Sequence, residues 1–193
     1  MMDVLVSGSG LLLGWPLFLI IAIVILLDSP GAGPFFVQDR VGKDGKIFRM
    51  VKFRTMVPDA ERQRASLLEY NEMDGPVFKI RRDPRITGVG RFLRKYCLDE
   101  LPQLYNVLLG DMSLVGPRPG LPEEVRQYDE AARCRLAVLP GITCYWQTAP
   151  ERNGLSFEEW MGLDRKYIRE QCLKTDMRIL VRTVQTALRG EGV

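Results

Sequence analysis

The most informative absence in this 193-residue sequence is histidine, which does not occur at all. Without an imidazole, any acid–base or nucleophilic chemistry must rely on Asp, Glu, Lys, Tyr, Ser or Cys. The formal net charge of +3 is too small to indicate nucleic-acid binding. The few cysteines lack the close spacing of a metal site, and in a reducing compartment we expect them in the core rather than in disulfides; they are Cys97, Cys134, Cys144 and Cys172.

Charged residues are also missing from Val4 to Leu27, and the range 11–27 is almost entirely apolar. At about 1.5 Å per residue this range is roughly 25 Å long, close to the bilayer hydrocarbon core of about 30 Å. A core helix of a soluble protein is the less favoured alternative. The first three residues include no basic side chain, which argues against a cleaved signal peptide. Residues 1–30 are therefore predicted to form a membrane helix, and residues 31–193 a cytosolic domain.

Trp15 and Pro16 interrupt the apolar segment near its middle. Pro removes a backbone hydrogen bond and kinks a helix, and Trp prefers the membrane interface to the bilayer centre. A re-entrant helix that breaks at Pro16 and returns to the side it entered from accounts for both residues, although a spanning helix stays open. In either case the basic residues after Asp28 place the globular part in the cytosol.

The rest of the chain predicts an α+β fold that is predominantly helical. Residues 35–41 and 46–53 are rich in aromatic and branched side chains and flank a Gly-containing turn, which indicates a small β-hairpin. Helices are predicted over residues 57–72, 88–96, 121–136 and 176–189, and after the capping box formed by Ser156 and Glu159. The helices at 88–96 and 176–189 are amphipathic and basic, as expected of helices at a membrane interface around one core.

Two adjacent carboxylates, Asp99 and Glu100, precede Leu101-Pro102 and an apolar helical run. Pro is tolerated in a first helical turn, so a helix is predicted to begin near Leu101 or Pro102, with its free N–H groups facing the carboxylates. Taken alone, this pattern most often means helix capping. Further along, Arg118 lies between two Pro residues, where a stiff loop suits a guanidinium that binds phosphate.

The stretch LDELPQLYNVLLGDMSLVGPRP, residues 98–119, resembles the signature of the bacterial polyprenol-phosphate phosphoglycosyl transferases of the small, monotopic type. KFRTM at residues 52–56 resembles the basic element of this bacterial sugar transferase family. PGIT at residues 140–143 extends the likeness toward the C-terminus. The sequence departs from the family pattern where Trp15 replaces Ser before Pro16 and where Glu151 replaces Gly.

The resemblance implies transfer of a sugar-1-phosphate from a UDP-sugar to undecaprenyl phosphate, which gives UMP and an undecaprenyl-diphosphate-linked sugar. This is the first membrane step of glycoconjugate assembly, at the cytoplasmic face of the bacterial inner membrane. Asp99 and Glu100 are implied as the catalytic residues, with Asp99 as the nucleophile that forms an aspartyl-phosphosugar, and both are implied as ligands of Mg²⁺. The implied substrate contacts are Lys52, Arg94, Arg118, Arg152 and Asp164.

Several alternatives stay open at this point. Asp164 lies on the apolar face of its predicted helix, where a carboxylate needs a partner, so a structural ion pair competes with a role in the site. The expected partners are a UDP-sugar, undecaprenyl phosphate and membrane lipid, with a homodimer left open. A Mg²⁺-dependent hydrolase of sugar nucleotides or lipid phosphates could use the same carboxylates. A membrane scaffold without activity would need neither the carboxylates nor Arg118.

Overall fold

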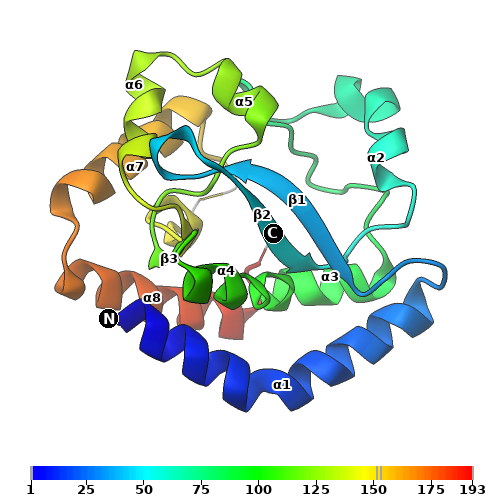
Figure 1. Ribbon diagram of the computed structural model, residues 1–193. Coiled ribbons are helices and arrows are strands. Elements are labelled where there is room, and N and C mark those ends of the chain that lie inside the picture. The colour runs from blue at the N-terminus through cyan, green and yellow to red at the C-terminus, as the bar shows by residue number, and fades with distance from the viewer. Residues whose placement is uncertain (1, 151, 153, 193) are drawn as a thin grey trace.

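The computed structural model describes residues 2–150, 152 and 154–192. Over this part of the chain most elements are helices, and the strands form two two-stranded sheets (Figure 1). In chain order the elements are α1 (Met2–Asp28), β1 (Phe35–Val41), β2 (Ile47–Phe53), α2 (Ala60–Gln63), α3 (Gly88–Lys95), α4 (Gln103–Leu109), β3 (Ser113–Val115), α5 (Pro122–Arg126), α6 (Glu130–Arg133), β4 (Gly141–Thr143), α7 (Phe157–Glu170) and α8 (Leu173–Arg189).

The predicted hairpin is confirmed. Strands β1 and β2 pair antiparallel, in a register that runs from Phe35 opposite Phe53 to Val41 opposite Ile47. Strands β3 and β4 form a short parallel pair that the sequence did not indicate. A buried cluster joins β2, α4, β3, α7 and α8 behind the hairpin; its members are Phe48, Met50, Val107, Met112, Leu114, Val115, Tyr167 and Ile179.

Helix α1 is long and apolar enough to cross a membrane, as predicted, but it continues through Pro16 instead of breaking there. Figure 1 shows it bent near its middle, which is the expected effect of a proline inside a helix. Both ends are tied to the globular body. The carboxylate of Asp3 accepts a hydrogen bond from the Leu114 backbone N–H at 3.2 Å, and that of Asp28 accepts one from Val89 N–H at 3.3 Å.

Two predicted helices are wrong in their extent. Residues 57–72 form only the one-turn α2 and a following 3₁₀ segment at Ala65–Tyr70, because this stretch has no continuous apolar stripe to bury. The helix expected over 121–136 is split into α5 and α6, since the Asp129 side chain accepts from Ala132 N–H at 2.7 Å and begins a second helix.

Helix α8 turns its predicted apolar stripe outward. Ile179 is fully buried on the core face, whereas Val181 is 53% and Leu188 78% exposed. Other large apolar side chains are exposed on α1, α3 and α4; they include Leu12, Leu13, Trp15, Phe92, Tyr105 and Leu109. Large apolar side chains are thus exposed on several helices of the protein.

Candidate active site

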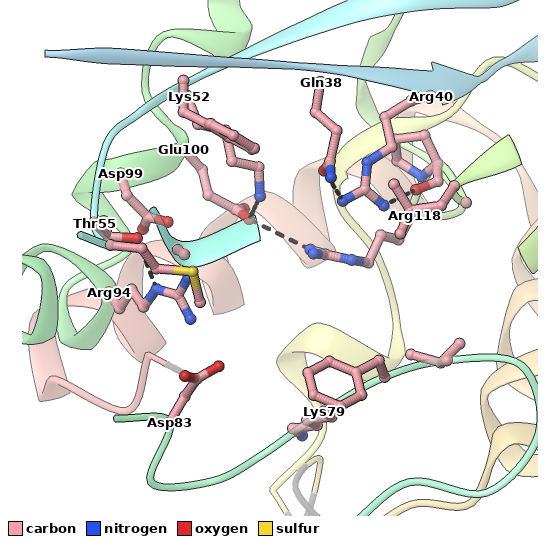
Figure 2. Close-up of a pocket in the computed structure, with 18 of the residues that line it drawn as sticks. Gln38, Arg40, Lys52, Thr55, Lys79, Asp83, Arg94, Asp99, Glu100 and Arg118 are labelled. Atoms are coloured by element: carbon pink, nitrogen blue, oxygen red, sulfur yellow. Dashed lines mark hydrogen bonds and ion pairs between the residues drawn. The ribbon is translucent and has the colours of Figure 1, made fainter. Parts of the chain in front are cut away.

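A cavity of about 340 Å³ opens between the hairpin, the segment that precedes α4 and the loop 117–120. Figure 2 shows its polar side chains converging from these elements. Six of the predicted site residues line it, namely Lys52, Arg94, Asp99, Glu100, Arg118 and Arg152, and Asp164 does not. The fold therefore brings together groups that are up to about a hundred residues apart in the sequence.

The two carboxylates lie on a 3₁₀ turn, Leu98–Glu100, and not on α4 itself. This turn follows Cys97, which has a left-handed backbone conformation with φ of 56°. The N-cap of α4 is Pro102, whose side chain makes no capping hydrogen bond. Helix capping is therefore not the role of Asp99 or Glu100, and both side chains are available to the cavity.

Glu100 forms ion pairs with two cations of the cavity, Lys52 and Arg118. Its Oε1 lies 2.8 Å from Lys52 Nζ and 3.4 Å from Arg118 Nη1 (Figure 2). Burial raises the pKa of Glu100, but the charges of Lys52 and Arg118 outweigh burial and lower this pKa to about 2. Burial in turn lowers the pKa of Lys52 against the attraction of Glu100. Glu100 is thus held as a charged, oriented carboxylate.

Asp99 is in a different electrostatic state from its neighbour. It is 9% exposed, and burial followed by the charge of Glu100 raises its pKa, against Lys52 and Arg94. Arg94 lies beside it in Figure 2 and donates from Nε to Thr55 Oγ1 at 2.9 Å. A carboxylate next to a second carboxylate is stabilised as the anion by any further cation that enters the cavity.

The remaining cations of the cavity differ in how they are held. Arg152 is 7% exposed and donates from Nη1 to the Gln147 carbonyl at 2.7 Å. Its Nη2 is buried and has no hydrogen-bond partner among the residues that the structure describes, which suits contact with an anion in the cavity. The neighbouring Glu151, a departure from the family pattern, lies outside the described residues.

Arg40 is a cavity residue that sequence reasoning missed. It is 8% exposed and donates to the Pro119 carbonyl at 3.0 Å and to Gln38 Oε1 at 2.7 Å. Its alternation with Phe36 and Gln38 on β1, all of which line the cavity, is a signal that the predicted hairpin already contained.

Asp164 lies behind the cavity wall. Its Oδ2 is 2.6 Å from Arg135 Nη2, and its side chain is 1% exposed. Burial raises the pKa of Asp164 to about 6 in spite of Arg135. Of the two readings that the sequence left open, the geometry favours the structural ion pair, because a carboxylate in this position does not reach the cavity.

Asp99 and Glu100 fit a Mg²⁺ ion that is also bound by water and substrate phosphates. The described residues contain no group of three or more His, Cys, Asp or Glu side chains that could hold a metal. Mg²⁺, however, is commonly bound by one or two carboxylates together with water and substrate phosphates. Asp99 and Glu100 match that requirement, and a divalent cation would relieve the repulsion from Glu100 that, after burial, raises the pKa of Asp99.

Comparison with known proteins identifies the family to which this arrangement belongs. The model of the bacterial sugar transferase family matches residues 1–190. The chain belongs to the bacterial sugar transferase family. This confirms the resemblance seen in the motifs, whose carboxylates and cations line one cavity.

Curated relatives of this chain carry descriptions related to the family's. The chain is 43% identical over 186 residues to galactosyl transferase CpsE of Streptococcus agalactiae. This match covers 95% of this chain and 41% of CpsE. It is 38% identical to the undecaprenyl-phosphate galactose phosphotransferase of Salmonella typhimurium, over 98% of this chain and 40% of the relative. The exopolysaccharide production protein ExoY of Rhizobium meliloti is 37% identical, over 98% and 85%. The chain thus spans about two fifths of the length of the first two relatives.

Proposed function

We propose that this protein transfers a sugar-1-phosphate from a UDP-sugar to undecaprenyl phosphate, with UMP and undecaprenyl-diphosphate-sugar as products. The observation that carries the proposal is the Asp99-Glu100 turn, which faces a cavity ringed by Lys52, Arg94 and Arg118. Both substrates are phosphates, so their reaction requires neutralisation of negative charge above all. The description of a relative as an undecaprenyl-phosphate galactose phosphotransferase agrees with this chemistry.

The reaction proceeds in two displacements at one phosphorus atom. In the first, a carboxylate oxygen of Asp99 forms a bond to the phosphorus that bears the sugar, and the bond from this phosphorus to the UMP oxygen breaks. The electron pair leaves with UMP, and an aspartyl-phosphosugar remains. In the second, a phosphate oxygen of undecaprenyl phosphate attacks the same phosphorus and releases the Asp99 carboxylate.

The side chains around Asp99 have distinct tasks in this scheme. Lys52 and Arg118 hold Glu100 by ion pairs of 2.8 and 3.4 Å and are placed to neutralise the phosphates. Arg94 is oriented by Thr55, and its charge opposes the burial and the Glu100 charge that raise the pKa of Asp99, which favours the nucleophilic anion. Asp99 and Glu100 would hold Mg²⁺, which when bound supplies further neutralisation of the phosphate charge.

We further propose that α1 is re-entrant and that the enzyme works at the cytoplasmic face of the bacterial inner membrane. Two features support this. Both ends of α1, at Asp3 and Asp28, hydrogen-bond to the same globular body, as required of a segment that returns to its side of entry. The outward apolar side chains of α1 and α8, such as Leu13 and Leu188 at 78% each, suit insertion into lipid. The phosphate of a membrane-bound acceptor then meets the cavity at the interface.

Incubation with the donor alone tests the covalent step. The purified full-length chain is mixed with a panel of UDP-sugars and Mg²⁺ and then analysed by intact mass spectrometry. We expect one equivalent of UMP and a sugar-phosphate adduct on Asp99. Asp99→Asn should form neither, because an amide is a poor nucleophile. Asp39→Asn is the matched control, since Asp39 is exposed on β1 outside the cavity.

The outcomes separate the proposal from its rivals. Competent enzyme that carries no adduct, and releases UMP only when lipid is present, contradicts the covalent mechanism. Continuous UMP release without any polyprenol phosphate indicates the hydrolase, which the transferase descriptions of the relatives do not favour. A protein that never releases UMP from any donor indicates a scaffold.

A further inference from the structure

Arg118 lies in the loop 117–120. The backbone carbonyl of each residue in this loop accepts a hydrogen bond. At its two ends the donors are backbone amides: Gly141 N–H donates to the Pro117 carbonyl and Val41 N–H donates to the Gly120 carbonyl, each at 3.0 Å. These bonds join the loop to β4 on one side and to β1 on the other. The ends of the loop are therefore fixed by the two sheets.

The two middle carbonyls are held differently, by buried arginine side chains. Arg135 Nη2 donates to the Arg118 carbonyl at 2.9 Å, and Arg40 Nη1 donates to the Pro119 carbonyl at 3.0 Å. Two of the loop's residues are prolines, which have no N–H, so the loop has few donors of its own for a regular ladder. Donors from elsewhere must satisfy the carbonyls of Arg118 and Pro119.

Each of these arginines is buried and individually supported. Arg135 is 7% exposed; its second Nη donates to Tyr128 Oη at 2.9 Å, and Asp164 compensates its charge at 2.6 Å. For Arg40, burial and then the charge of Arg118 lower the pKa to about 10, against the attraction of Glu124. Burying a charge is costly unless it is paired, and a neutral donor would satisfy a carbonyl at less cost. A planar guanidinium, by contrast, holds several acceptors in one fixed geometry.

Arg40 and Arg135 are buried, whereas the Arg118 side chain is partly exposed. It is 35% exposed and reaches from the loop to Glu100, at 3.4 Å (Figure 2). A displacement of its backbone moves the guanidinium by a similar amount, and a misplacement of about 1 Å can cost about a hundredfold in rate. The position of the loop therefore sets the position of this cation relative to the carboxylates.

We propose that Arg40 and Arg135 are positioning residues, which fix the backbone on both sides of the Arg118–Pro119 peptide so that the Arg118 guanidinium meets Glu100 and the donor phosphates. On this view Asp164 serves the reaction indirectly, by keeping Arg135 charged and in place. The inference rests on the proposed transfer reaction and adds to it the two residues that hold its phosphate-binding arginine.

A double-mutant cycle tests the inference in the full-length protein. Arg135→Met is combined with Asp164→Asn, so that no unpaired buried charge is left. This pair, Arg118→Ala and the combination of all three substitutions are compared in kcat/KM for UDP-sugar. Arg133→Gln is the matched control, since Arg133 is exposed on the neighbouring helix α6.

We expect each arm of the cycle alone to lower kcat/KM by roughly tenfold to a hundredfold, and the combination to be lower than Arg118→Ala by no more than about threefold. Arg40→Met should behave in the same way against Arg118→Ala, and Arg133→Gln should leave kcat/KM unchanged. If the losses in kcat/KM of the separate variants instead multiply in the combined variant, Arg135 and Arg40 do not act through Arg118. That result would overturn the inference.

The design also distinguishes failure of this inference from failure of the proposed function. If the wild type releases no UMP from any UDP-sugar, the transfer reaction is wrong, and the same cycle is read from calorimetric binding of inorganic pyrophosphate. Non-additive losses of pyrophosphate affinity would still support positioning of Arg118. Additive losses in that measurement would overturn it.

Discussion

The buried carboxylate of Asp164 makes the stability of this protein depend on pH in a direction that can be worked out. The side chain is 1% exposed and has Arg135 as its ion-pair partner at 2.6 Å. Burial nevertheless raises its pKa from 3.8 to about 6. The folded state therefore binds a proton at Asp164 more tightly than the unfolded state does, and Asp164→Asn removes this difference.

The sign and size of the effect follow from linkage. For a carboxyl group whose pKa is raised in the folded state, the stabilisation is present at pH below the unfolded pKa and is lost as the pH rises through the folded pKa. At about 1.4 kcal/mol per pKa unit, a shift of about two units corresponds to about 3 kcal/mol. Between about pH 4 and pH 7 the wild type should therefore lose about 3 kcal/mol of unfolding free energy relative to Asp164→Asn.

Thermal unfolding of both proteins in the same mild detergent, across this pH range, measures the difference. Tryptophan fluorescence is a suitable signal, because Trp146 and Trp160 stack at 4.0 Å in the buried cluster on which α7 packs. Subtracting the two curves cancels the groups that titrate alike in both proteins. Arg135→Met, which removes the partner, should shift the midpoint to higher pH. A flat difference curve would show that the ion pair offsets burial, an opposite slope would show that it outweighs burial, and either result would refute the reasoning.

Three further predictions concern helix α1, Arg118 and the backbone strain at Cys97. Cysteines introduced at Met2 and Lys43 should both be labelled only from the cytoplasmic side of intact cells, whereas periplasmic labelling at position 2 would establish a spanning α1. Arg118→Lys should fold and insert yet lose most activity in the UMP assay, because an ammonium cannot reproduce the guanidinium fork; near-normal turnover would make Arg118 a generic charge. Cys97→Gly should raise the unfolding free energy by about 1 kcal/mol because it relieves the left-handed φ of 56°, and Cys97→Val should lower it. Equal destabilisation by the glycine and valine variants would show that the thiol contacts outweigh backbone strain.

Elements with local signals were predictable from the sequence. The hairpin β1–β2, the apolar helix α1 and the capping box at Ser156, in which the hydroxyl accepts from Glu159 N–H at 3.2 Å, all depend on residues close together in the chain. The candidate site was predictable in part, because motifs with a family resemblance named Asp99, Glu100 and their cations. The identity of these candidate site residues thus follows from residue type and short sequence spacing, without knowledge of the tertiary structure.

Tertiary structure alone decided how those residues are used. Lys52 and Glu100 are 48 residues apart, and Arg40 and Pro119 are 79 apart, so no local pattern predicts either contact. Asp164 illustrates the difference: the sequence showed that a carboxylate on an apolar face needs a partner, but only the fold supplied Arg135, which lines the cavity, and placed the Asp164 carboxylate behind the cavity wall. Burial and long-range pairing set the charge state and position of each group, and both depend on the packing of distant segments.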